Sequence, residues 1–119
     1  MDKIYISQPI RGKTPKEIKA ERDAALGDII AGLGMAVKLA NPVVLNMDKG
    51  EVWCLGRDIQ RLSEAVEAFF LPGWENEPGC RVERSVCEYF NIVCCDLSGD
   101  AEHGYAMPGG QMRLSGGKT

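Results

Sequence analysis

The spacing of apolar residues along this chain predicts strands that alternate with helices. Short, nearly continuous apolar runs are typical of buried strands, and apolar residues that recur every three or four positions are typical of helices with one buried face. Strands are predicted at residues 3–7, 35–45, 67–71 and 92–95, and helices at 15–32, 53–66 and 78–89. The second strand prediction is the least regular, because Asn41-Pro42 interrupts its apolar run.

Local signals support the starts of two of these helices. Thr14-Pro15-Lys16-Glu17 has the form of a capping box with proline at the first helical position. Pro78 is placed in the same way after the loop that begins at Leu71-Pro72-Gly73. Both helices are therefore expected to start immediately after a loop.

Alternating strands and helices over about 100 residues predict an α/β fold, a small parallel sheet of four to five strands with helices on both faces. Residues 1–96 are expected to form this domain. Residues 97–119 are rich in glycine, and we expect a loop or a disordered tail unless a partner, such as a second subunit, orders it.

Composition narrows the class of protein. With 119 residues, 45% of them hydrophobic and 26% charged, the chain suits one ordinary globular domain. A net charge of −3 with scattered basic residues does not favour a binder of duplex nucleic acid. No secretory signal or membrane-spanning run is recognisable, so a cytoplasmic protein without membrane contact is expected.

Metal and cofactor motifs are not apparent. The five cysteines lack a C-x-x-C pair, so free thiols are expected, and His103 sits in a loop-like segment where a solvated side chain is expected. Neither a Walker loop nor a G-x-G-x-x-G element is present. The sequence therefore predicts no metal site and no cofactor.

Three segments are expected to meet at the carboxyl edge of the sheet, where ligands bind in such folds. They are the loop after the first strand up to Lys13, the segment Gly56-Arg57-Asp58, and the loop from Trp74 to Glu83. Glu83 lies about one turn into its helix, where a carboxylate beside a cleft can act as a nucleophile, although glutamate is common there for structural reasons. Arg11, Gly12 and Lys13 could bind phosphate or form only a solvated turn.

The order of these segments resembles the nucleoside 2-deoxyribosyltransferase-like proteins, which include deoxynucleoside 5′-monophosphate N-glycosidases and small phage and bacterial members. The resemblance covers residues 3 to about 95 and implies a flavodoxin/Rossmann-like fold. It rests on Ile4-Tyr5-Ile6-Ser7-Gln8-Pro9-Ile10-Arg11-Gly12, Asn41-Pro42, Arg57-Asp58-Ile59-x-x-Leu62, and Leu71-Pro72-Gly73-Trp74-Glu75 followed by Gly79 and Glu83.

The resemblance implies catalytic roles for three residues. Glu83 would attack C1′ of the deoxyribose and form a covalent sugar–enzyme intermediate. Tyr5 would hold this carboxylate through its hydroxyl, and Asp58 would hydrogen-bond or protonate the departing base. Trp74 could stack on a base, or pack as a structural side chain after the strand. The expected substrate-binding residues are Ser7, Gln8, Arg11, Gly12, Trp74, Glu77 and Gly79.

The chain departs from the family at two places, one that bears on the catalytic acid and one that leaves the choice between nucleoside and 5′-monophosphate open. Many relatives carry Cys-Asp where this chain has Ala65-Val66, which leaves Asp58 as the main candidate acid. Relatives that bind a 5′-phosphate tend to carry serine where this chain has Glu77, whose charge would repel phosphate, whereas Arg11 and Lys13 would favour an anion.

Two further functions compete with the glycosidic reaction. One is a non-catalytic binder of nucleotides or nucleotide-derived signals, and the other is a purely structural or interaction protein. The resemblance also implies a homo-oligomer whose subunits complete each other's sites, with the tail residues Tyr105, Gln111 and Arg113 as candidates for that contact.

Overall fold

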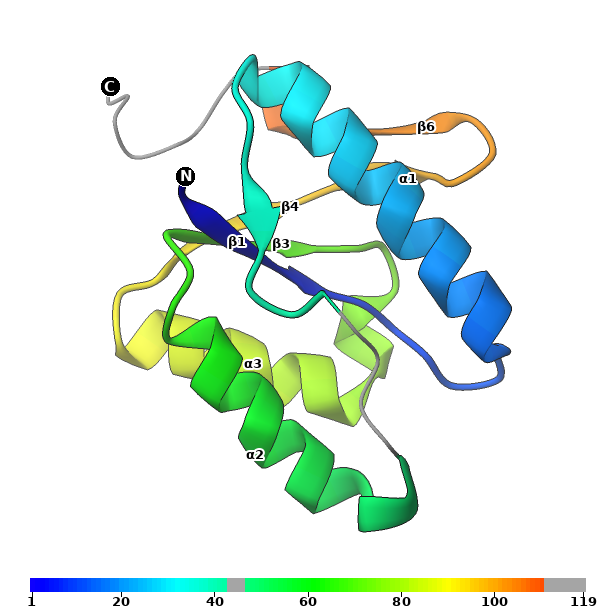
Figure 1. Ribbon diagram of the computed structural model, residues 1–119, viewed down its shortest axis with the longest axis vertical. Coiled ribbons are helices and arrows are strands. Elements are labelled where there is room, and N and C mark those ends of the chain that lie inside the picture. Colours follow the sequence, from blue (N-terminus) through cyan, green and yellow to red (C-terminus); the bar gives the residue numbers. More distant parts are fainter. Residues whose placement is uncertain (43–46, 111–119) are drawn as a thin grey trace.

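The central feature of the fold is a four-stranded parallel sheet with three helices, seen in a computed structural model that describes residues 1–42 and 47–110 (Figure 1). The strand order is β2-β1-β3-β4. The elements are β1 Lys3–Ser7, α1 Pro15–Leu33, β2 Lys38–Leu39, α2 Glu51–Leu62, β3 Glu67–Phe70, α3 Pro78–Tyr89, β4 Val93–Asp96, β5 Ser98–Asp100 and β6 Gly104–Ala106. The predicted α/β fold with a parallel sheet is thus confirmed.

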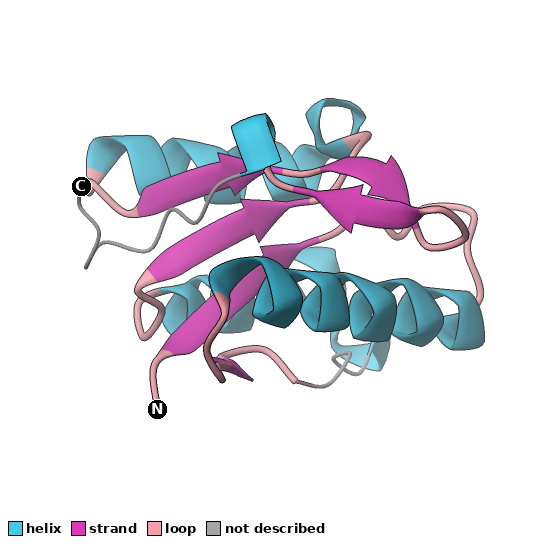
Figure 2. Ribbon diagram, turned by 90° about the horizontal axis from the view of Figure 1, so that it is seen from above, coloured by secondary structure: helices cyan, strands magenta, loops and turns pink. Residues whose placement is uncertain are grey.

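The helices cover both faces of the sheet, as predicted (Figure 2). Residues alternate along β1, so Ile4 and Ile6 pack with Ile29 of α1, while Tyr5 packs on the opposite face with Leu62 and Cys87 of α2 and α3. Two apolar clusters result, one on each side. The polar carboxyl end of β1 lies on the same side of the sheet as α2 and α3.

The predicted starts of α1 and α3 are confirmed. The Thr14 hydroxyl accepts the Glu17 backbone N–H at 3.1 Å, and the Glu17 carboxylate accepts the Thr14 N–H at 2.8 Å, which completes the capping box. Helix α1 ends at Gly34, whose φ of 70° lies in the left-handed region that glycine tolerates. Helix α3 begins with Pro78 at its first position.

Two predicted elements differ from those observed. The strand predicted at 35–45 is reduced to Lys38–Leu39 among the described residues, and residues 43–46 lie outside them. The helix predicted at 53–66 spans Glu51–Leu62 instead. It ends early because the Ala65 N–H turns back to the Leu62 carbonyl and the Val66 N–H binds the Lys3 carbonyl of β1.

The start of the glycine-rich tail is ordered by its own chain. β5 and β6 form an antiparallel hairpin, and the Tyr105 N–H donates to Asp28 of α1 at 2.7 Å. Leu97 and Met107 are buried in the cluster under α1. The domain therefore extends beyond the predicted boundary at residue 96, whereas Gln111 and Arg113 lie outside the described residues.

Other expectations concern the cysteines, His103 and membrane-spanning segments. None of the five cysteines, all of which lie in the described residues, forms a disulfide, and Cys95 is buried and Cys94 half-buried in β4. His103 is exposed in the hairpin turn, where its ring lies 3.1 Å from an oxygen of Asp100. Within the part of the chain that the structure describes, no helix has the length and apolar character needed to cross a membrane.

Candidate active site

A cavity of about 660 Å³ opens where β1 ends, between α1, α2 and the start of α3. Its wall includes side chains from all these elements and from the loop after β1. Those that bear on its chemistry are Tyr5, Gln8, Arg11, Lys13, Arg22, Asp58, Glu77 and Glu83. The segments expected to meet at the carboxyl edge of the sheet therefore do meet, with α1 as an additional wall.

Glu83 is buried in this wall, with 5% of the residue exposed. One carboxylate oxygen accepts the Tyr5 hydroxyl at 2.7 Å and the other accepts the Ser7 hydroxyl at 2.7 Å. Tyr5 and Ser7 lie two residues apart on β1 and therefore point to the same face of the sheet, towards α3. The strand thus holds both oxygens of one carboxylate in a fixed orientation.

Opposing effects act on the pKa of Glu83. Burial raises the pKa of its carboxyl to about 7, and the charge of Asp58 adds to this effect. The hydroxyls of Ser7 and Tyr5, together with the charge of Arg22, lower the pKa again because they stabilise the ionised form. A substantial fraction of Glu83 is therefore ionised at neutral pH. Burial also raises the pKa of Tyr5, which stays a hydrogen-bond donor.

Asp58 is the second acid of the cavity. It projects from α2, and burial raises the pKa of its carboxyl, while Arg61 and Arg22 lower it. A carboxyl group with a raised pKa can carry a proton for a leaving group. One cavity therefore contains a carboxylate oriented by two hydroxyls and a separate candidate proton donor.

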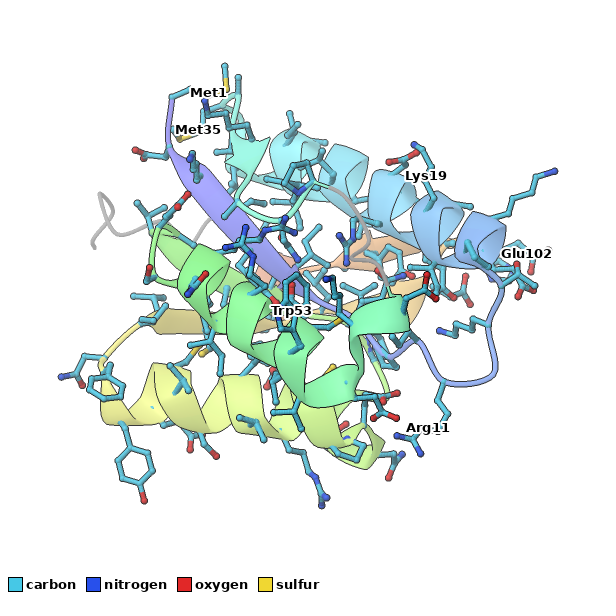
Figure 3. All side chains as sticks on the ribbon, turned by 60° about the horizontal axis from the view of Figure 1, so that its bottom comes forward. Met1, Arg11, Lys19, Met35, Trp53 and Glu102 are labelled. Atoms are coloured by element: carbon cyan, nitrogen blue, oxygen red, sulfur yellow. The ribbon has the colours of Figure 1, made fainter. Side chains whose placement is uncertain are left out.

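The carboxylate of Glu77 binds backbone N–H groups of the loop after β1. One of its carboxylate oxygens accepts the N–H groups of Ile10 and Arg11, both at 3.3 Å, and the other lies 3.6 Å from the Arg11 guanidinium. Figure 3 shows Arg11 extending from this loop near the start of α3. Lys13 is paired with Glu21 at 2.9 Å. Both cations predicted to favour an anionic ligand therefore already face carboxylates of the chain.

Gln8 lines the cavity as predicted, but its amide is engaged inside the protein. Its nitrogen donates to the Ile18 carbonyl at 2.9 Å and to Glu21 at 3.1 Å. Its oxygen accepts the Nε–H of Arg22 at 3.2 Å. The observed contacts make Gln8 a support for α1 and for Arg22.

Arg22 is the residue that sequence reasoning missed. It lies four residues after Ile18 and three before Ala25, two buried positions of α1, so it interrupts the apolar stripe of that helix. A cation on a buried helical face was the available signal. Its Nη1 donates to the Asn41 carbonyl at 2.6 Å, which places the guanidinium in the cavity wall.

Three of the expected substrate-binding residues, Ser7, Gly12 and Trp74, lie outside this wall, and Ser7 donates instead to Glu83. Trp74 packs on Phe70, with ring centroids 5.3 Å apart, and on the Arg84 guanidinium at 4.7 Å. It borders a separate hollow of about 360 Å³ near the end of β4. Gly12 is exposed and supplies the positive φ of 79° that the loop needs to turn. Gly79 lies in the wall at the start of α3.

Comparison with known proteins adds no assignment to this geometry. Among residues 1–42 and 47–110, no group of three or more His, Cys, Asp or Glu side chains could hold a metal ion. No protein-family model, curated protein sequence or solved structure matches this chain.

Proposed function

We propose that this protein cleaves or transfers the N-glycosidic bond of 2′-deoxynucleosides through a covalent deoxyribosyl–glutamate intermediate. The observation that supports the proposal is the carboxylate of Glu83, which is held by Tyr5 and Ser7 at 2.7 Å in the wall of a cavity that also contains Asp58. The resemblance to nucleoside 2-deoxyribosyltransferase-like proteins assigns matching roles to Glu83, Tyr5 and Asp58.

The proposed reaction is a displacement at C1′ of the sugar. A carboxylate oxygen of Glu83 forms a bond to C1′ while the bond from C1′ to the base nitrogen breaks, and its electrons leave with the base. Asp58 donates a proton to the base, which neutralises the departing charge. Water or a second base then attacks C1′ as the bond from Glu83 to C1′ breaks, and the proton that the attacking group loses returns to Asp58. The product therefore keeps the original configuration at C1′.

Glu77 favours substrates without a 5′-phosphate. Its carboxylate already accepts the loop N–H groups of Ile10 and Arg11 and faces the Arg11 guanidinium, the groups that would otherwise suit a phosphate. A phosphate near Glu77 would meet like charge in a partly buried place. We therefore propose nucleosides rather than 5′-monophosphates as the preferred substrates.

The reaction as proposed uses side chains for both the nucleophile and the acid, and requires no cofactor. The partner is a small nucleoside and neither duplex nucleic acid nor a membrane. Five cysteines outside disulfides fit the reducing conditions of the cytoplasm, where we propose that the protein acts.

The test is an assay for free base. The protein is incubated with deoxynucleosides and their 5′-monophosphates, with and without an acceptor base, and products are separated by chromatography. Base release is expected for the native protein and for Glu75→Gln, whose side chain is exposed and borders the other hollow. Glu83→Gln should lower turnover by at least about a thousandfold, as loss of a nucleophile does.

A binding measurement with the same compounds, made beside the base-release assay, separates the main alternative. Tight binding of a nucleoside or nucleotide without base release, unaffected by Glu83→Gln, would show a non-catalytic binding protein. Full turnover by Glu83→Gln would remove Glu83 from the mechanism.

A further inference from the structure

The cavity wall contains a cation whose charge is not matched by a carboxylate in direct contact. Among residues 1–42 and 47–110, Arg22 forms no ion pair, whereas the lining cations Arg11 and Lys13 lie against Glu77 and Glu21. A partly buried guanidinium is costly unless nearby charge and hydrogen bonds compensate it. The groups that stabilise the charge of Arg22 therefore determine its effect on the acids of the cavity.

Two amide groups fix the guanidinium in place. The Nε–H donates to the side-chain oxygen of Gln8 at 3.2 Å and Nη1 donates to the backbone carbonyl of Asn41 at 2.6 Å. Both acceptors are themselves held. Gln8 binds α1, and the Asn41 side chain exchanges two hydrogen bonds with the backbone of Ile6, at 2.9 and 3.2 Å. Because both acceptors are neutral, the arrangement fixes the position of the charge without cancelling it.

The fixed charge of Arg22 acts on two acids of the cavity wall. Arg22 lines the same cavity as Asp58 and Glu83, and its own charged form is favoured by the charges of these acids. The other titratable groups around Glu83 are Tyr5 on β1, Cys80 and Cys87 on α3, and Glu77 at the helix start. None of these groups carries a positive charge. The other cations nearby have acidic partners of their own: Arg11 and Lys13 lie against Glu77 and Glu21. Arg84 pairs with Asp96, and Arg61 acts on Asp58.

We propose that Arg22 is a positioning residue of this cavity, and that its guanidinium supplies the fixed positive charge that keeps the Glu83 carboxylate ionised for attack. The catalytic part of this inference rests on the proposed function. The electrostatic part concerns the folded protein and can be measured without substrate.

The experiment is a titration of Glu83 by carbon-13 NMR in the full chain labelled at glutamate carboxyls, with the Glu83 signal assigned by its loss in Glu83→Gln. Native protein should titrate with a midpoint of about 7. Arg22→Gln keeps hydrogen-bonding capacity and removes the charge, so the midpoint should rise by about one pH unit, the size of a partly screened charge interaction. Arg22→Lys restores the charge and should return the midpoint to within about 0.3 of the native value.

Arg57→Gln is the matched control, because Arg57 is exposed on α2 and contacts the Gln60 side chain. It changes the net charge equally and should leave the midpoint unchanged. A native midpoint in Arg22→Gln would overturn the proposal. A rise of a full unit in Arg22→Lys would also overturn it, and that variant decides the matter if Arg22→Gln does not fold.

Kinetics give an independent readout. If Glu83 must be ionised to attack, the acidic limb of kcat/KM for base release should move to higher pH by the same amount in Arg22→Gln and return in Arg22→Lys. A shifted NMR midpoint in a protein that releases no base would contradict the proposed reaction and retain the electrostatic role. Base release with an unshifted limb would contradict the role of Arg22 and retain the reaction.

Discussion

At the scale of single residues, Glu83 combines burial with a charge that the proposed chemistry needs. The folded state raises its pKa to about 7 from an ordinary value of 4.5. Below pH 4.5 the carboxyl is protonated in both folded and unfolded chains. Between pH 4.5 and 7 the unfolded chain gains stability by ionising while the folded chain resists it, so this group makes folding less favourable as pH rises, and the full cost is present above pH 7.

Glu83→Gln should therefore stabilise the fold at high pH. We expect the difference in free energy of unfolding between Glu83→Gln and native protein to be about 3 kcal/mol more favourable to the variant at pH 8 than at pH 4. Urea unfolding at both values measures this. The surface variant Glu75→Gln should change little at either pH, and a Glu83→Gln gain that is equal at pH 4 and pH 8 would contradict the assigned cause.

Glu77 carries the prediction on substrate choice. Removing its charge in Glu77→Gln should improve kcat/KM for 5′-monophosphates relative to nucleosides by about tenfold, because the loop N–H groups and Arg11 then face a neutral side chain. The ratio is measured in competition between a nucleoside and its monophosphate. An unchanged ratio in Glu77→Gln would show that this end of the cavity does not meet the 5′ position.

The observed role of a residue differs from the predicted one where the role depends on contacts between distant parts of the chain. The sequence placed Tyr5 and Glu83 in one site by resemblance, and the structure brings them to 2.7 Å. Ser7 was expected at the substrate and instead binds Glu83. The alternation of a strand puts Tyr5 and Ser7 on one face, but only the packing of α3 against that face shows which acid they contact.

At the scale of elements, the β5–β6 hairpin was not predicted, because the glycine-rich composition of this segment indicated a loop. Glycine-rich sequence is typical of loops, but here glycine permits a tight strand pair. Gly99 has a φ of 95°, and a Cβ built on it would lie 2.1 Å from the backbone oxygen of Gly104. The hairpin packs on α1 through contacts distant in sequence, such as that of Tyr105 with Asp28, and periodicity in a short window does not reveal such contacts.

Gly99→Ala should therefore disrupt this hairpin. We expect it to lower the free energy of unfolding by about 2 kcal/mol, from backbone strain and the close contact. Gly27→Ala is the matched control, because Gly27 lies within α1 with nothing within 4 Å of an added Cβ, and it should raise stability by about 0.5–1 kcal/mol. Thermal unfolding of both variants tests the pair, and equal effects would contradict the assigned backbone strain at Gly99 of β5.

At the scale of the whole molecule, the prediction concerns assembly. The resemblance implies a homo-oligomer, and we expect light scattering at micromolar concentration to give the mass of a dimer or larger assembly. A mass of 13.0 kDa for the chain at that concentration would contradict this expectation. Tyr105, one of the tail residues expected to contact a neighbouring subunit, is half-buried against its own α1 cluster and is therefore already used within the chain.

The sequence by itself determined the fold class, the presence of three helices, the capped or proline-marked starts of α1 and α3, and the segments that meet at the carboxyl edge of the sheet. These features follow from local periodicity and from the rule that parallel strands end on one side. Tertiary structure alone decided that the β5–β6 hairpin packs on α1 and that Trp74 borders a different hollow. It also decided that the Glu77 carboxylate binds loop N–H groups and that Arg22 lies in the cavity wall. The physical reason is that burial, pKa and hydrogen bonding depend on neighbours supplied by distant parts of the chain.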